Sequence, residues 1–177
     1  MDPRKVEETF GTLVETESKA LFSFLYWSLG RHEDALDALQ ETLIRIHRGL
    51  PELRAADSVR RWAFRIATNV AHNIREKRRH DPSNYGLDAD EEAPTLRERP
   101  RTPAHELAEK ETNERLRRAL AELPAELREP LILHTVSGMK YREISDALSV
   151  PIGTVTSRIH AARMKLQEVL GDELDEF

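Results

Sequence analysis

The sequence predicts an all-α protein made of two small helical domains joined by a flexible acidic linker. Three observations favour this fold class. Apolar residues recur at helical spacing through most of the 177-residue chain. Hydrophobic residues make up 39% and aromatic residues 6%, which suits two modest helical cores better than one large core. Between residues 81 and 104, prolines and clustered acids interrupt the helical pattern.

The composition also bears on the class of function. Cysteine is absent, so a disulfide framework, a thiolate nucleophile and a cysteine-ligated metal are excluded. The seven histidines show no metal-ligand spacing, and no nucleophile–base pattern stands out, so we expect neither an enzyme nor a cofactor or metal. No run approaches the apolar length of a membrane span, and the N-terminus does not resemble a signal peptide. We therefore expect a cytoplasmic protein that does not insert into membranes.

The N-terminal part is expected to form a helical bundle. Residues 3–29 form one or two helices, interrupted at Gly30. A further helix over Glu33–Arg48 should bury Ala35, Leu36, Leu39, Leu43 and Ile46. Its other face carries Asp37, Gln40, Glu41, Ile44 and Arg48. Ile44 is apolar in the middle of a polar face, and the pattern alone leaves open whether it is a scattered surface residue or part of a protein-binding patch.

A strongly basic helix follows over Ser58–His80, with Ser58 as its N-cap. Its apolar stripe consists of Val59, Trp62, Ala63, Ile66, Val70 and Ile74, and the opposite side carries Arg61, Arg65, Thr68, His72, Arg75 and Arg79. The segment holds seven arginines and lysines and a single acid, for a local net charge of +6, whereas the whole chain carries −5. A localised basic stripe in an acidic chain favours a nucleic-acid partner over a merely solvated face. Residues 1–81 are predicted to form the first domain.

Residues 82–104 are predicted to be a linker. Between Asp81 and Glu114, ten acids oppose four bases, and prolines break any helix. Such a segment cannot bury enough apolar surface to fold by itself. An ordered active-site loop is the alternative, but no residue in the segment recommends it.

The second domain is predicted over residues 105–177. Helices are expected over Glu106–Glu122, Ala125–Val136 and Tyr141–Leu148, and Thr154 should cap a longer helix that runs to about Leu170. A short helix, a tight turn and a long helix form a helix-turn-helix, whose second helix enters the DNA major groove. The long helix should bury Val155, Ile159, Ala162, Leu166 and Val169, whereas Thr156, Ser157, His160, Met164 and Gln167 point outward and Arg158, Arg163 and Lys165 flank them. Residues 171–177 are expected to be a frayed acidic tail.

Three stretches together resemble the extracytoplasmic-function group of bacterial RNA polymerase sigma factors. Asp37–Leu43 (DALQETL) is similar to the family's D-L-V-Q-E-T-F motif, and Val59–Asn69 (VRRWAFRIATN) is similar to F-x-x-W-L-x-R-I-A-x-N. Tyr141–Ser145 and Pro151–Arg158 resemble Y-x-E-I-A and P-x-G-T-V-x-S-R. The motifs occur in the family's order and extend over nearly the whole chain.

The resemblance implies a sigma factor that binds core RNA polymerase and directs promoter recognition. It implies contact with two parts of the polymerase, the clamp helices of the β′ subunit and the β subunit. The residues that would dock on the clamp helices are Asp37, Gln40, Glu41, Ile44 and Arg48. It implies that the −10 element is bound as a single strand by Arg61, Trp62, Arg65, Asn69, Asn73, Arg75 and Arg79, although Trp62 lies at the edge of the apolar stripe and suits a core position better than a stacking role. It implies that the −35 duplex is read by Thr154, Thr156, Ser157, Arg158, His160, Arg163 and Lys165.

Further expectations concern partners. The resemblance implies that the linker threads the polymerase's RNA path and that an anti-sigma factor covers the binding faces. We expect a monomer that binds promoter DNA poorly alone, because the acids of the linker and tail oppose the basic helix. The alternatives are a stand-alone helix-turn-helix regulator that binds operator DNA as a dimer, and an adaptor that uses the Ile44 face without binding DNA.

Overall fold

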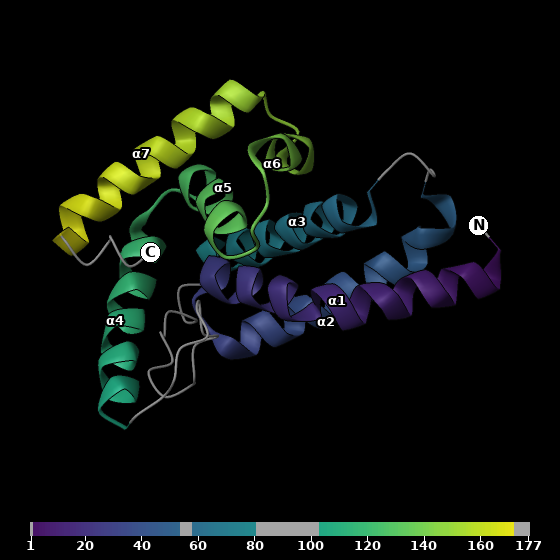
Figure 1. Cartoon of the computed structure of the whole chain (residues 1–177), viewed down its shortest axis with the longest axis horizontal. Helices are drawn as coiled ribbons and strands as arrows, with labels where there is room; N and C mark the ends of the chain where they lie inside the picture. The colour runs from purple at the N-terminus through teal and green to yellow at the C-terminus, as the bar shows by residue number, and fades with distance from the viewer. Residues whose placement is uncertain (1, 54–57, 81–102, 172–177) are drawn as a thin grey trace.

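The computed structural model describes residues 2–53, 58–80 and 103–171, with the side chains of 103–110 left aside. Within these ranges every regular element is helical, which confirms the all-α prediction (Figure 1). The elements are α1 (Pro3–Leu29), α2 (His32–Gly49), the 3-10 helix η1 (Leu50–Glu52), α3 (Val59–His80), α4 (Pro103–Glu122), α5 (Ala125–Thr135), α6 (Tyr141–Leu148) and α7 (Ile152–Leu170). None of these helices is long and apolar enough to cross a membrane. Residues 82–102 of the predicted linker and 172–177 of the predicted tail lie outside the described residues.

The N-terminal segment is a single helix. Asp2 caps α1 by accepting a hydrogen bond from the Arg4 amide at 3.2 Å, and Pro3 occupies the first turn, where its missing N–H costs nothing. Gly30 ends the helix in the left-handed conformation, with φ of 77° and its N–H bonded to the Tyr26 carbonyl. Of the two possibilities left open by the sequence, the structure therefore has one continuous helix.

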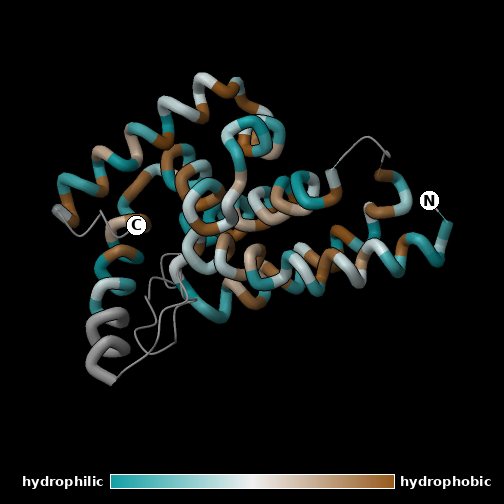
Figure 2. Tube along the Cα trace, viewed as in Figure 1, coloured by the Kyte–Doolittle hydropathy of each residue, from teal (hydrophilic) through white to brown (hydrophobic). Residues whose placement is uncertain are grey.

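Helices α1, α2 and α3 contact one another and enclose the N-terminal core. Trp27, Phe24 and Phe64 are the largest fully buried side chains there, and Phe24 and Phe64 meet edge to face with ring centroids 6.0 Å apart. Hydrophobic and hydrophilic residues alternate along the helices in Figure 2, as amphipathic helices require.

Several predicted burial assignments are wrong. Leu36 and Val169 were expected in the core, but they are 49% and 56% exposed. Thr68, placed on the polar side of the basic helix, is buried, and its hydroxyl donates to the Phe64 carbonyl at 2.9 Å. Phe64 lies outside the predicted apolar stripe, yet it is fully buried. The reason is that periodicity shows which residues are apolar, whereas the neighbouring helices decide how wide a face is covered.

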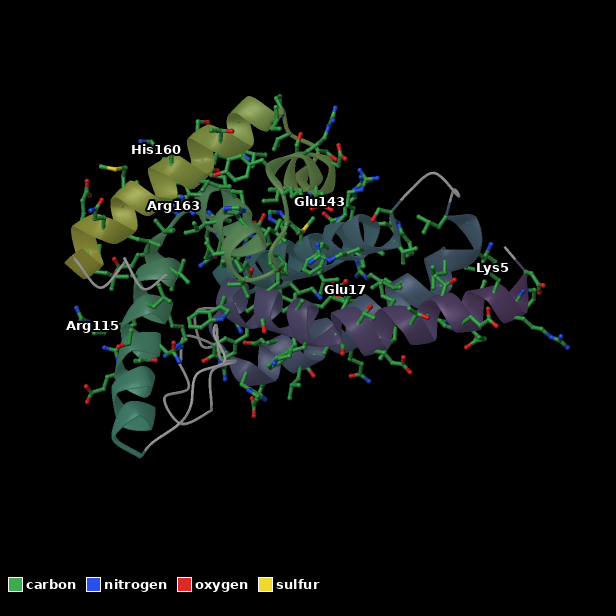
Figure 3. All side chains as sticks on the ribbon, in the orientation of Figure 1. Lys5, Glu17, Arg115, Glu143, His160 and Arg163 are labelled. Carbon is green, nitrogen blue, oxygen red and sulfur yellow. The ribbon has the colours of Figure 1, made fainter. Side chains whose placement is uncertain are left out.

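The C-terminal domain contains the predicted helix-turn-helix, formed by α6 and α7. Ser149 ends α6 in the left-handed conformation, and the Ser145 hydroxyl donates to the Val150 carbonyl at 2.6 Å across the turn. Glu143, labelled in Figure 3, begins α6 by accepting a hydrogen bond from the Lys140 amide at 2.9 Å. The prediction that Thr154 caps the long helix is wrong. α7 begins at Ile152, and the Thr154 amide already donates within its first turn.

The two domains are in contact. α3 packs against α6, and α1 packs against both α4 and α5. On α4, the buried Arg117 donates to the Gly30 carbonyl at 2.6 Å and pairs with Glu114. Burial alone would raise the pKa of Glu114, but hydrogen bonds from Arg117 and Arg118 outweigh it and hold the pKa below its usual value. The hydrogen bond from Arg117 to Gly30 therefore joins α4 to the end of α1, and Glu114 on the same helix pairs with the Arg117 guanidinium.

Gly49 sits where α2 meets the ring of Trp62. A Cβ at this position would lie 2.7 Å from Trp62 Cζ2 and 3.0 Å from Cη2. We expect Gly49→Ala to lower the free energy of unfolding by about 1–3 kcal/mol through overpacking, as measured by urea denaturation.

The control for Gly49→Ala is Gly11→Ala in the middle of α1, where a Cβ would meet nothing within 4 Å. This change should stabilise the protein by about 0.4–1 kcal/mol, since alanine restricts the unfolded chain. Equal effects of the two substitutions would contradict the close approach at Gly49.

Candidate nucleic-acid interface

The outer face of α2 carries a mixed polar and apolar surface. Asp37, Gln40, Ile44 and Arg48 are exposed along it, and Ile44 retains 38% of its accessible surface. Leu36, found exposed rather than buried, extends the apolar part by two helical turns. Glu41 is half-buried and accepts a hydrogen bond from Arg45 at 2.6 Å, a partner that the sequence analysis missed. An exposed apolar pair ringed by polar side chains is typical of a protein-binding surface.

The predicted basic face of α3 is largely turned toward the C-terminal domain. Arg61 pairs with the Asp146 carboxylate on α6, and Arg65 donates to the Asp146 carbonyl at 2.9 Å. Arg75 pairs with Glu129 on α5, and the two side chains are only 13% and 12% exposed. Sequence reasoning missed Asp146 and Glu129, because nothing local connects them with residues more than fifty positions earlier.

Other basic residues of α3 serve the fold. Arg60 donates to Glu17 on α1 at 2.9 Å and to the Ser137 carbonyl, and Glu17 can be found on α1 in Figure 3. Arg78 bonds to the Leu29 carbonyl at 3.1 Å and pairs with Asp34. The +6 charge of this helix is therefore partly a structural feature, which the composition alone does not reveal.

The other residues of α3 that were predicted to bind the single strand are three exposed side chains and one tryptophan. Asn69, Asn73 and Arg79 are exposed, and Arg79 pairs with Glu76 at 3.1 Å. Trp62 is half-buried and packs against the core and Gly49, which favours the core position. Its remaining surface lines a cleft between α3 and α6.

Two clefts of about 500 Å³ each lie along the contact between α3 and the C-terminal domain. The first is lined by Arg61, Trp62 and Arg65 from α3 and by Ser145 and Asp146 from α6. The second brings Asn69 and His72 of α3 to Glu126 and Glu129 of α5 and to Arg158 of α7. Arg65 lines both clefts, so the two predicted nucleic-acid surfaces adjoin each other here.

The outer face of α7 is exposed to solvent. Thr156, Ser157, His160, Arg163 and Lys165 are exposed, and Figure 3 places His160 and Arg163 along this helix. The hydroxyls of Thr156 and Ser157 bond to carbonyls of their own helix at 3.0 Å, those of Ile152 and Thr154. Thr154 and Arg158 are half-buried at the N-terminal end. A solvent-facing row of hydroxyls, imidazole and cations on the second helix of a helix-turn-helix has the form of a major-groove surface.

Buried charge accompanies the contact of α3 with α5. Arg128 is buried and donates to the Leu120 and Ala121 carbonyls at 3.3 and 3.4 Å. Burial lowers the pKa of Arg128 to about 10, and the nearby Arg75 contributes to the decrease, while Glu129 opposes it. Glu129 pairs with Arg75, whereas Arg128 donates its hydrogen bonds to backbone carbonyls.

Among the residues that the structure describes, no cluster of three or more histidines and carboxylates could hold a metal ion.

Family models match both halves of the chain. Residues 13–81 match Sigma-70 region 2, and residues 113–166 match Sigma-70, region 4. The fold and its surfaces thus define a two-domain protein of the sigma-70 type.

Comparison with individual relatives shows to which group of sigma-70-type proteins the chain belongs. The chain is 31% identical to the ECF RNA polymerase sigma-E factor of Escherichia coli K12 over 134 residues, which cover 73% of this chain and 70% of that protein. The sigma-E factor of Salmonella typhimurium LT2 matches to the same extent, and that of Haemophilus influenzae is 26% identical, covering 91% and 87%. The chain belongs to the extracytoplasmic-function (ECF) sigma factors.

Two solved structures share the fold. The sigma factor RpoE of Bartonella quintana, in complex with the anti-sigma factor NepR, matches with a TM-score of 0.71 at 24% identity, covering 93% of this chain and 98% of that one. CnrH, in complex with the cytosolic domain of CnrY, matches with a TM-score of 0.67 at 24% identity, covering 93% and 88%.

Family membership establishes the activity at a coarse level. The protein is a sigma factor, which binds core RNA polymerase and directs promoter recognition and transcription initiation. A stand-alone regulator that acts without polymerase is not favoured.

Proposed function

We propose that residues 1–81 bind the polymerase and the −10 element, that residues 105–177 read the −35 element, and that residues 82–104 link the two. The observation that carries the proposal is that one chain presents both an apolar patch ringed by polar residues on α2 and an open polar and cationic face on α7. The first suits a protein partner and the second suits duplex DNA. The β′ clamp helices are the proposed partner of α2, with a further contact to the β subunit.

The single-stranded −10 element is assigned to α3. Asn69 and Asn73 are exposed amides that can hydrogen-bond an unpaired base, and Arg61, Arg65, Arg75 and Arg79 supply guanidinium groups for the phosphates. Binding of an extruded base offsets part of the cost of unpairing and so favours the open complex.

An anti-sigma factor is the proposed regulatory partner. One structural neighbour, RpoE of Bartonella quintana, is a sigma factor in complex with the anti-sigma factor NepR. The exposed Leu36 and Ile44 support the same partner here, because a protein that covered them would also block the polymerase. The proposed location is the cytoplasm, with a monomer as the free state.

Run-off transcription tests the proposal. Purified core polymerase is combined with this protein on a library of bacterial promoters, and transcripts are expected only when both are present. Asn69→Ala should reduce promoter opening by about 10-fold or more, the size of loss expected when an important base contact is removed, as measured by permanganate reactivity of the melted strand.

Two measurements test whether the effect of Asn69→Ala comes from a lost contact with the strand and not from unfolding. Its side chain is exposed, so its stability should stay within about 0.5 kcal/mol of the parent. The control Glu8→Ala, at an exposed position on α1, should open promoters as the parent does. Dimeric binding to duplex DNA without polymerase, together with no initiation, would refute the proposal in favour of a regulator.

A further inference from the structure

The long helix of the helix-turn-helix carries large apolar side chains that are not buried. Five such side chains are exposed in the part of the chain that the structure describes: Leu36 and Ile44 on α2, and Ile152, Met164 and Val169 on α7. The two on α2 belong to the proposed polymerase contact. Because α7 is the helix proposed to enter the major groove, the position of each apolar residue along it decides whether a base is within reach.

Ile152 lies at the end of α7 that is closest to the bases in such a complex. It is the first residue of the helix, and 51% of its surface is exposed. In a helix-turn-helix, the residues at the N-terminal end of the second helix contact the base edges. Met164 lies about 18 Å further along the helix axis, and Val169 lies in the last turn. Ile152 is therefore the exposed apolar side chain best placed to meet a base.

Thr156 continues the same surface one helical turn later. Residues four positions apart share a helix face, and the Thr156 hydroxyl donates to the Ile152 carbonyl at 3.0 Å. This proton is therefore not available to guanine N7 or O6, which accept hydrogen bonds and need a donor. The side chain still has a methyl group to offer to a base. Ile152 and Thr156 together are called the apolar pair of α7.

An apolar side chain in the major groove favours one base. Thymine carries a C5 methyl group, whereas the groove edges of the other bases offer hydrogen-bond donors and acceptors without a methyl group. Contact with that methyl group removes apolar surface from water on both sides. Contact with a donor or acceptor would instead leave it without a hydrogen-bond partner. The apolar pair should therefore discriminate in favour of thymine.

Cations on the same helix can supply the affinity that the apolar pair lacks. Arg163 and Lys165 are exposed on α7, and Figure 3 shows Arg163 on this helix. Contacts of such side chains with phosphates fix the register of a protein on DNA but do not read the sequence. The contact of the apolar pair with a base would add selectivity to a complex that is held by these charges.

We propose that Ile152 and Thr156 are specificity-determining residues that read the C5 methyl group of a thymine in the −35 element. This inference rests on the proposed assignment of the −35 duplex to α7. Ile152 makes the main contact, because it is exposed and wholly apolar, and the Thr156 methyl group extends it. The −35 element that this protein selects then contains, on either strand, at least one thymine whose methyl group contributes to binding.

Removal of the methyl group from the DNA is the first test. The full chain with core polymerase selects −35 elements from a random duplex library, and each thymine of the selected element is replaced in turn by deoxyuridine, which pairs in the same way but lacks the methyl group. At one thymine we expect the affinity to fall about 4-fold, the change that corresponds to burial of one methyl group. A selected element without thymine, or without a sensitive thymine, would overturn the inference.

A double-mutant cycle assigns the methyl contact to Ile152. Ile152→Ala should lower the affinity for the thymine duplex about 4-fold and show no further loss with deoxyuridine, because both changes remove the same contact. Ile152→Val keeps the branched methyl groups and should retain most of the sensitivity to deoxyuridine. If Ile152→Ala is as sensitive to deoxyuridine as the parent, the two groups are not in contact and the inference is overturned.

Thr156→Ser tests the second member of the apolar pair. The substitution removes a methyl group and keeps the hydroxyl, so it should reduce the sensitivity to deoxyuridine while the helix remains intact. Unchanged sensitivity in this variant would refute the role of Thr156.

Met164→Ala is the matched control. It also removes an exposed apolar side chain from α7, but far from the N-terminal end of the helix, and its sensitivity to deoxyuridine should equal that of the parent. Loss of the sensitivity in this control would overturn the inference. The affinity of each variant for core polymerase without DNA is measured alongside. A loss there in Ile152→Ala would place this residue in a protein contact and would also overturn the inference.

The two proposals can fail separately. Arg163→Ala/Lys165→Ala should weaken binding to the −35 duplex to a similar extent for all sequences, as the loss of phosphate contacts does. If this variant binds the duplex as the parent does, the assignment of the −35 duplex to α7 fails. If it weakens binding but the cycle shows no coupling between Ile152 and the methyl group, the α7 assignment stands and the reading of thymine is refuted.

Discussion

Replacing Phe64 by alanine is expected to destabilise the N-terminal domain by about 3–5 kcal/mol, the usual cost of deleting a buried phenyl ring. Phe64 is fully buried on α3, meets Phe24 of α1 edge to face, and lies beneath the guanidinium group of Arg60, 5.3 Å from the ring centroid. The substitution therefore removes apolar burial, an aromatic pair and a cation–π contact together. Urea unfolding followed by circular dichroism measures the loss.

Phe10→Ala is the matched control. Phe10 is half-buried near the start of α1 and meets the His47 ring with centroids 4.9 Å apart. Its loss should cost clearly less than that of Phe64, because less surface is taken from water and the site lies at a rim. Equal costs for the two phenylalanines would contradict the position of Phe64 at the centre of the three-helix core.

Replacing Ile44 by glutamate is expected to weaken binding to core RNA polymerase by about 100-fold or more, since a charge would be buried in the apolar centre of the proposed contact. Ile44 is exposed in the free protein and surrounded by Asp37, Gln40 and Arg48. The free energy of unfolding should change little, because nothing buried is disturbed. Fluorescence anisotropy with labelled sigma factor and purified core enzyme gives the affinity.

Two further variants test whether the polymerase contact is confined to the exposed face of α2. Leu36→Glu should also weaken polymerase binding, because Leu36 is exposed on the same helix. Thr12→Glu exchanges an exposed β-branched residue on α1 for the same charge and should bind as the parent does. An affinity of Ile44→Glu equal to that of Thr12→Glu would remove α2 from the polymerase contact.

The sequence predicted the helices well because their signals are local. Gly30, Gly138 and the Ser149–Pro151 turn interrupt the apolar period at the points where helices end or turn. The buried stripe of α7 was predicted correctly at Val155, Ile159, Ala162 and Leu166. The prediction for Val169 was wrong, because this residue lies in the last turn of α7 and its side chain is exposed.

By itself, the sequence determined the all-α class, the helix-turn-helix and the family, since each depends on spacing within a short stretch. Only the tertiary structure decided which basic side chains of α3 are paired with carboxylates of the same chain. The basic stripe of α3 meets Asp146 and Glu129, residues distant in the chain, and their proximity follows from how α6 packs on α3 and α5 packs on α1 and α6. Charge partners of this kind leave no periodic signal, because a surface carboxylate has the same local pattern whether it faces water or an arginine.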